Sequence, residues 1–98
     1  MELTGRQIRQ LRALANRVTA TIAIGKAGVD AVITQTDREL EAHELIKCSV
    51  QNTSPIGVKE ASLALARRTQ SEVVQVIGKK FVLYRPSERD DIERIQLV

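Results

Sequence analysis

Residues 45–51, LIKCSVQ, constrain the fold more than any other part of the chain. Apolar and polar side chains alternate along them: Ile46, Cys48 and Val50 against Lys47, Ser49 and Gln51. Alternate side chains of a strand point to opposite faces of a sheet, so one face of this strand is buried and the other is wet. We therefore expect a two-layer domain in which helices pack on one face of a sheet.

The rest of the chain predicts helices and strands in the order αβαβαββ. The segments lie at about residues 4–18, 21–24, 29–43, 45–51, 55–69, 72–77 and 81–85. Thr4 and Gln7 have the spacing of a capping box, and Ser54-Pro55 suits the entry to the third helix. Strand-helix-strand crossovers make the first three strands parallel, and their right-handed sense puts the helices on one face. The prediction is an α/β (α+β-like two-layer) fold with a mixed four-stranded sheet and its helices packed on one face.

The last two strands are predicted to form a hairpin. Residues 78–79, Gly-Lys, suit a two-residue type II′ loop, which favours glycine in its first position. The resulting register pairs Val73 with Tyr84. It places Tyr84 on the outer face of the sheet together with Gln75.

Composition excludes several classes of protein. The 98 residues fit one domain, predicted over residues 1–87 with a charged tail at 88–98 that either docks or stays loose. One cysteine, Cys48, and one histidine, His43, do not make a metal cluster. No nucleophile elbow or P-loop is present, so we expect no cofactor, no metal, no small-molecule substrate and no enzyme activity. The polar start, MELTGRQIRQ, and the lack of a long apolar run predict a cytoplasmic protein away from membranes.

Positive charge is concentrated in two blocks of the sequence. Residues 1–28 hold five basic residues and one acid, and residues 61–85 hold the same numbers, whereas residues 29–60 and 86–98 are acidic. The formal net charge of +3 therefore understates the patch that forms if the two blocks meet in space. A patch of this kind attracts anionic partners such as nucleic acid.

Residues 25–28, Gly-Lys-Ala-Gly, lie where a strand is predicted to turn into a helix. The N-terminus of a helix presents unpaired N–H groups, and glycines let an anion approach the backbone. Lys26 adds a full positive charge. The local sequence leaves two alternatives, an ordinary tight turn or a phosphate-binding corner.

The first helix carries a face of four arginines, Arg6, Arg9, Arg12 and Arg17, opposite its apolar face. No acid lies among them from residue 3 to residue 23. This face is either a solvated surface or a contact for an anionic partner.

Four separated motifs carry a family resemblance: LTGRQIRQLRALA, IGKAGV, HELIKCSV and VVQVIGKKFVLYRPS. Together they resemble the bacterial YhbY-like proteins of the chloroplast RNA splicing and ribosome maturation (CRM) domain family, in unbroken order from residue 3 to residue 87. Where the family often has a Thr-Gly helix stop, this chain has Thr69-Gln70. The end of the third helix thus lacks the residue that most readily adopts a left-handed conformation.

The resemblance implies an RNA-binding domain whose fold is similar to the C-terminal domain of translation initiation factor three. Bacterial members are associated with precursors of the large ribosomal subunit (pre-50S), and the GxxG loop is the family's proposed RNA contact. The candidate RNA-binding residues are Gly25, Lys26, Ala27, Gly28, Arg6, Arg9, Arg12, Arg17, Lys47, Lys79 and Lys80. We expect a monomer whose partner is ribosomal RNA or its precursor.

The aromatic content limits how RNA is held. Phe81 and Tyr84 are the only aromatic residues, and single-strand readers stack bases on several such side chains. We therefore expect structured RNA held through its phosphate backbone. The alternative is an adaptor that docks a ribosomal protein on the acidic second helix or on the outer sheet face, at Lys47, Gln75 and Tyr84.

Overall fold

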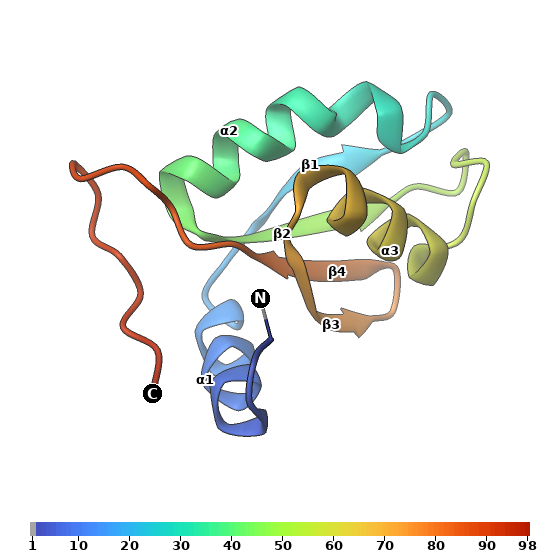
Figure 1. The fold of residues 1–98 in the computed structure, drawn as a ribbon. Coiled ribbons are helices and arrows are strands. Elements are labelled where there is room, and N and C mark those ends of the chain that lie inside the picture. Colours follow the sequence, from blue (N-terminus) through green and yellow to red (C-terminus); the bar gives the residue numbers. More distant parts are fainter. Residues whose placement is uncertain (1) are drawn as a thin grey trace.

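The computed structural model describes residues 2–98, and a four-stranded sheet runs through its centre (Figure 1). The elements are α1 (Gly5–Ala15), β1 (Ala20–Ile24), η1 (Val29–Val32), α2 (Ile33–His43), β2 (Leu45–Val50), α3 (Val58–Thr69), β3 (Glu72–Ile77) and β4 (Lys80–Tyr84). The strands lie in the order β1-β2-β4-β3, with β1 and β2 parallel and β4 antiparallel to both of its neighbours. The prediction of a mixed four-stranded sheet with this element order is confirmed, and so is the common direction of the first three strands.

One face of the sheet is covered by α2 and α3. Ile22, Ile46 and Phe81 from three strands pack there against Leu40 of α2 and Leu65 of α3. Each of these side chains is at most 2% exposed. This layer is the larger of the two apolar cores that the described residues form.

The opposite face of the sheet is covered by α1, so the prediction that all helices pack on one face was wrong. Leu11 and Ala15 of α1 pack against Leu45, Val82 and Tyr84 in a separate core. The physical reason lies in β4, where four successive apolar residues are buried. A strand that is apolar on both faces needs a cover on both. Figure 1 shows α1 below the sheet and α2 and α3 on its other side.

A bulge in β3 corrects the predicted hairpin register. Gln75 pairs with Val82, but Val73 pairs with Leu83 because the register shifts between Val73 and Gln75. Tyr84 lies on the predicted face of the sheet but is only 2% exposed there, because α1 covers that face. The proposed docking face that included Tyr84 is therefore closed by a helix. The predicted two-residue loop itself is present, with Gly78 at φ +57°.

The ends of α3 differ from the prediction in two ways. The helix begins at Val58 with Gly57 as its N-cap, three residues later than expected. The Ser54 hydroxyl instead accepts from the Ile56 N–H at 3.3 Å and donates to the Ile56 carbonyl, which closes a local loop. At the other end, Gln70 takes the left-handed conformation itself (φ 56°, ψ 40°), so the helix stops without glycine.

The C-terminal segment is docked and does not extend into solvent. It leaves β4 and descends beside α1 (Figure 1). The Glu44 carboxylate, placed on the outer face of its helix by the sequence pattern, is buried and accepts from the backbone N–H groups of Ser87 at 2.6 Å and Ile95 at 2.7 Å. The Val98 N–H donates to the Gln10 side chain at 3.0 Å. Residues far apart in the sequence thus hold α1 and the C-terminal segment together.

Candidate nucleic-acid interface

The Gly-Lys-Ala-Gly corner is a tight turn between β1 and η1. The Gly28 N–H donates to the Gly25 carbonyl at 3.0 Å, and Gly28 adopts φ +75°. Glycine is needed there because other residues rarely adopt such a φ. Lys26 and Ala27 at the tip are exposed, whereas Gly28 is buried. The predicted helix begins as the 3-10 turn η1, and no side chain caps its first N–H groups.

Gly25 lies against the side chain of Gln51. A Cβ atom at this position would lie 2.6 Å from Oε1 of Gln51, so the exposed end of that side chain would have to move aside. Gln51 follows β2, and its N–H donates to the Ile24 carbonyl at 2.8 Å. The corner therefore packs against the loop after β2, and Gly28 is the position in it whose backbone conformation requires glycine.

Three loops gather at this end of the sheet, because β1 and β2 are parallel and the β3–β4 hairpin points the same way (Figure 1). We call residues 25–28, 51–57 and 78–79 the loop end. The Lys79 ammonium donates to the Asn52 side chain, and the Lys79 carbonyl accepts from the Val50 N–H at 2.8 Å. A hollow of about 380 Å³ lies between Lys79 and residues 50–58. The structure thus brings Lys26 and Lys79 to one end of the molecule.

The exposed lysines in and beside the loop end differ in their partners. Lys26, and Lys80 at the start of β4, make no ion pair with a carboxylate of residues 2–98. Lys59, in the first turn of α3, is also exposed and directly follows this loop. Lys59, Gln51 and Asn52 were not among the predicted contacts because they lie in the acidic part of the chain. The signal that could have found them is their position just after a strand parallel to β1.

The basic residues of α1 lie on the other side of the sheet from α2 and α3. Arg6, Arg9 and Arg17 are exposed and unpaired with any carboxylate in the described part of the chain. Arg12 is exposed too, but its Nε donates to the Val74 carbonyl at the β3 bulge, at 3.2 Å. Lys47 is half-buried and its Nζ donates to the Ala15 carbonyl at 2.8 Å. Two of the five predicted contacts therefore attach α1 to the sheet.

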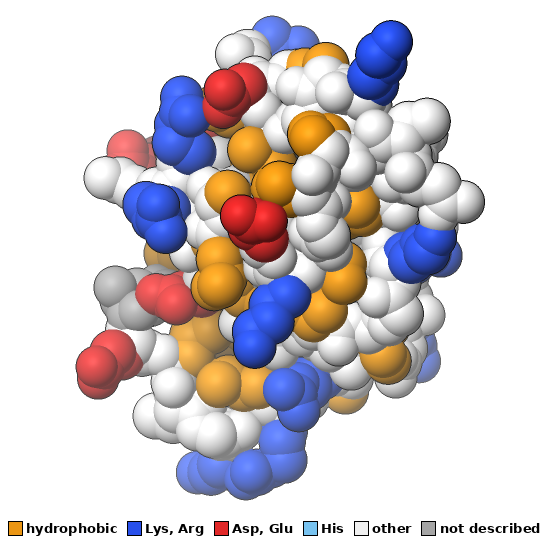
Figure 2. All heavy atoms as spheres, turned by 90° about the vertical axis from the view of Figure 1, so that its right-hand side faces the viewer, with side chains coloured by type: hydrophobic (Ala, Val, Ile, Leu, Met, Phe, Trp, Pro, Cys, Tyr) orange, Lys and Arg blue, Asp and Glu red, His pale blue; other side chains and the backbone are white. Residues whose placement is uncertain are grey.

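The two basic blocks of the sequence do not merge into one compact patch. Figure 2 shows the face that carries the hairpin, where Lys and Arg side chains are scattered from top to bottom with hydrophobic side chains between them. In Figure 1, α1 and the corner between β1 and α2 lie at opposite ends of the molecule. A single anionic partner that contacts both has to span the sheet.

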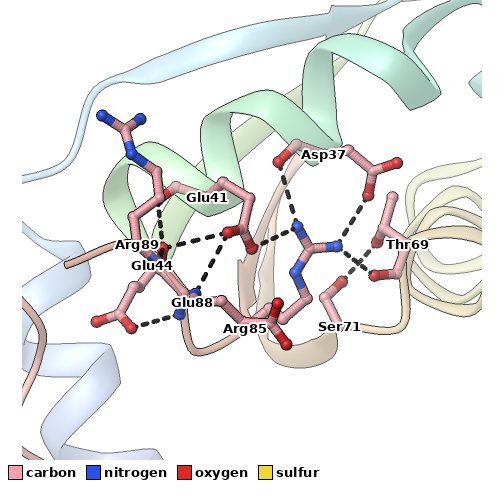
Figure 3. Close-up of polar contacts among 9 residues, drawn as sticks. Asp37, Glu41, Glu44, Thr69, Ser71, Arg85, Glu88 and Arg89 are labelled. Carbon is pink, nitrogen blue, oxygen red and sulfur yellow. Dashed lines mark hydrogen bonds and ion pairs between the residues drawn. The ribbon is translucent and has the colours of Figure 1, made fainter. Parts of the chain in front are cut away.

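Arg85 is an arginine whose guanidinium binds several groups of the protein itself (Figure 3). Its Nη1 donates to Asp37 Oδ1 at 2.8 Å and to the Thr69 carbonyl at 2.7 Å, and its Nη2 lies 3.2 Å from Glu41 Oε2. These contacts tie β4 to α2 and to the end of α3. One guanidinium faces two carboxylates, so this cluster carries net negative charge and does not attract a nucleic acid.

Cys48 and Tyr84 are structural residues. Burial, with a smaller contribution from the charge of Glu39, raises the pKa of the Cys48 thiol to about 12. Burial and the nearby Glu44 also raise the pKa of Tyr84. Among residues 2–98, no group of three or more His, Cys, Asp or Glu side chains is placed to hold a metal ion. No helix within the same range has the length and apolar character needed to cross a bilayer.

Comparisons with known proteins agree on one family. A family model of the CRS1 / YhbY (CRM) domain matches residues 3–85. The relative named "Probable RNA-binding protein YqeI" of Bacillus subtilis is 40% identical over 89 residues, covering 90% of this chain and 93% of the relative. A relative from Haemophilus influenzae named "RNA-binding protein" is 33% identical over 92 residues, covering 93% of each. The solution structure of SAV1595 from Staphylococcus aureus matches with a TM-score of 0.72 and 40% identity, covering 96% of this chain and 100% of that one.

Proposed function

The chain belongs to the CRS1/YhbY (CRM) domain family, and from this premise we propose that it binds structured RNA through the phosphate backbone. The loop end is the primary contact, and the free arginines of α1 form the secondary one. The observation that carries the proposal is the exposed, unpaired Lys26 on a glycine corner that a second loop supports. Exposed N–H groups, close backbone approach and a mobile positive charge are the features that hold phosphate oxygens.

The burial of both aromatic residues supports backbone contact over base stacking. Phe81 is 0% exposed and Tyr84 is 2% exposed, so neither presents a ring to a single strand. A protein that stacks successive bases needs exposed aromatic platforms. Lysine, arginine and backbone N–H groups remain, and these recognise the shape and charge of folded RNA.

The proposal extends to large ribosomal subunit assembly in the cytoplasm, with precursor ribosomal RNA as the partner of a monomer. Its support is the family resemblance together with relatives named as RNA-binding proteins. The alternative, an adaptor for a ribosomal protein, had two candidate docking surfaces. The outer sheet face is no longer one of them, because α1 covers Tyr84, so the acidic α2 is the surface left for docking.

Charge reversal at the corner tests the proposal. Lys26→Glu should weaken binding to a structured ribosomal RNA fragment at least about tenfold, which is about 1.4 kcal/mol, and should leave the unfolding transition unchanged. Arg38→Glu is the matched control, because Arg38 is exposed on α2 and unpaired with any carboxylate that the structure describes. Equal RNA affinity of the two variants would remove the corner from the mechanism.

Crosslinking in cells identifies the RNA. We expect sequencing of the bound RNA to return large-subunit precursor sequences for the wild-type protein and to lose them with Lys26→Glu. An unrelated set of transcripts would contradict the assembly role and leave RNA binding intact. Loss of ribosomal particles through changes in α2 alone would favour the adaptor.

A further inference from the structure

A second hollow, of about 410 Å³, lies at the end of β1 and β2 opposite the loop end. It is surrounded by the last turns of α1 and α2, the starts of β1 and β2, and the C-terminal segment. Its apolar surface includes Leu14, Leu45 and Ile95. Nothing in residues 2–98 fills it, and Leu14 is 41% exposed. Binding sites for small molecules and cofactors combine an apolar surface with a few polar groups that orient the ligand.

The charge at the rim decides which part of an RNA can enter. Glu39 lines the groove and is held in place by two contacts: it accepts from the Thr21 hydroxyl and, at 3.1 Å, from the Gln35 amide. A fixed carboxylate repels a phosphate. It accepts hydrogen bonds from N–H groups, and the exocyclic amino group of cytosine is one that carboxylates accept from in nucleic-acid complexes.

Two other residues at the rim, Arg17 and His43, can contact a nucleobase and the phosphate next to it. Arg17 and His43 line the same groove and are both exposed. Arginine and histidine side chains are among those on which unstacked RNA bases stack. Arg17 also stands free of the carboxylates that the structure describes, so its charge can attract the phosphate next to the base.

We propose that this groove holds one unstacked nucleobase of the bound RNA and prefers bases that carry an exocyclic amino group. The inference rests on the proposed RNA-binding function and deepens it by adding a point of base recognition to a backbone contact. β1 separates the groove from Lys26 by roughly 17 Å, since its five residues rise about 3.3 Å each. The two sites can therefore be tested independently.

The test uses the full chain and three labelled RNA probes in fluorescence anisotropy: a cytidylate octamer, a uridylate octamer, and a hairpin stem in which every base is paired or capped. We expect the wild-type protein to prefer the cytidylate octamer over the uridylate octamer by about fivefold or more. Leu14→Gln should weaken cytidylate binding about fivefold and leave stem binding unchanged. Leu63→Gln is the matched control, because Leu63 is a similarly exposed leucine (52%) on α3.

A second pair of variants tests base preference. Glu39→Gln should abolish most of the preference for cytidylate, because an amide both donates and accepts and so serves uracil as well. Glu60→Gln removes the same charge from the exposed first turn of α3 and should keep the preference. Both changes raise general RNA affinity alike, so the ratio between the octamers isolates the groove.

The outcomes separate the two proposals. The groove proposal is overturned if Leu14→Gln and Leu63→Gln bind the cytidylate octamer equally well. It is also overturned if Glu39→Gln leaves the ratio between the octamers unchanged. The groove would then be a site for a protein side chain or a second copy of this chain. If stem binding still depends on Lys26 in that case, the proposed function survives. If the wild-type protein binds none of the three probes, the proposed function itself fails.

Discussion

The loop end and α1 carry positive charge in two different ways. At the loop end, Lys26 projects from a tight turn that Gly28 closes at φ +75° and that lies against Gln51. Around α1, Arg12 of the helix and Lys47 of β2 join the helix to the sheet through backbone carbonyls, while Arg6, Arg9 and Arg17 are exposed. The difference teaches that basic residues counted along a sequence divide into those that hold elements together and those that face a partner.

Removal of residues 88–98 should have the largest effect on the free energy of unfolding. It removes contacts with the α1 core and leaves the loop end intact. Ile95 and Leu97 pack on the α1 core, and Glu44 loses one of the two N–H groups that its buried carboxylate accepts. We expect a loss of about 2–4 kcal/mol in the free energy of unfolding, measured by urea denaturation. Affinity for a paired RNA stem should change less than about twofold. A truncated protein of wild-type stability would mean that the C-terminal segment contributes nothing to the α1 layer.

Lys47→Met and Arg9→Met together should distinguish a cation that holds the fold together from one that faces solvent. Loss of the hydrogen bond to the Ala15 carbonyl, at the end of α1, should cost about 1.5–2 kcal/mol of unfolding free energy with little effect on the affinity for a paired stem. Arg9→Met should do the reverse, with unchanged stability and RNA binding weakened about threefold. Thermal melts and anisotropy on both variants check this. Equal effects of the two changes on RNA affinity would erase the distinction.

Cys48 has no pH-dependent effect on stability near neutral pH, and its effect is confined to alkaline pH. Its folded pKa is raised from 9.0 to about 12, so the unfolded thiol loses its proton first as pH rises. The contribution of the protonated Cys48 thiol to the free energy of unfolding is therefore fully present below pH 9. It declines above pH 9 by up to about 1.4 kcal/mol per pH unit. The difference between the wild type and Cys48→Val in urea midpoints across this range measures it. A constant difference would contradict the raised pKa, as would rapid native-state alkylation near neutral pH.

The elements with strong local signals could be predicted from the sequence. The capping box at Thr4 and Gln7 forms as its spacing indicates, and the Gly78 loop joins β3 to β4. These features depend on residues within a few positions of one another. The crossovers also predicted that β1 and β2 run in parallel, which is what brings the corner and the loop after β2 together.

The position of α1 and of the C-terminal segment could not be predicted in the same way. The run FVLY in β4 is apolar without alternation, which is the one sign that both faces of the sheet are covered. The β3 bulge turned Val74 into the α1 core, whereas Tyr84 kept its predicted face and was buried because α1 covers that face. Glu44 looked like part of a solvated helix face, yet it ends α2 at φ 66° and is 1% exposed. Its partners Ser87 and Ile95 lie more than forty residues away.

The salt dependence of RNA binding tests the central claim most directly. If about five phosphates are neutralised, log K should fall with log salt at a slope of roughly −3.5 to −4.5. Lys26→Glu should make the slope shallower by about one, whereas Arg38→Glu should leave it unchanged. A slope near zero for the wild-type protein, or equal slopes for wild type and Lys26→Glu, would contradict phosphate binding at the loop end.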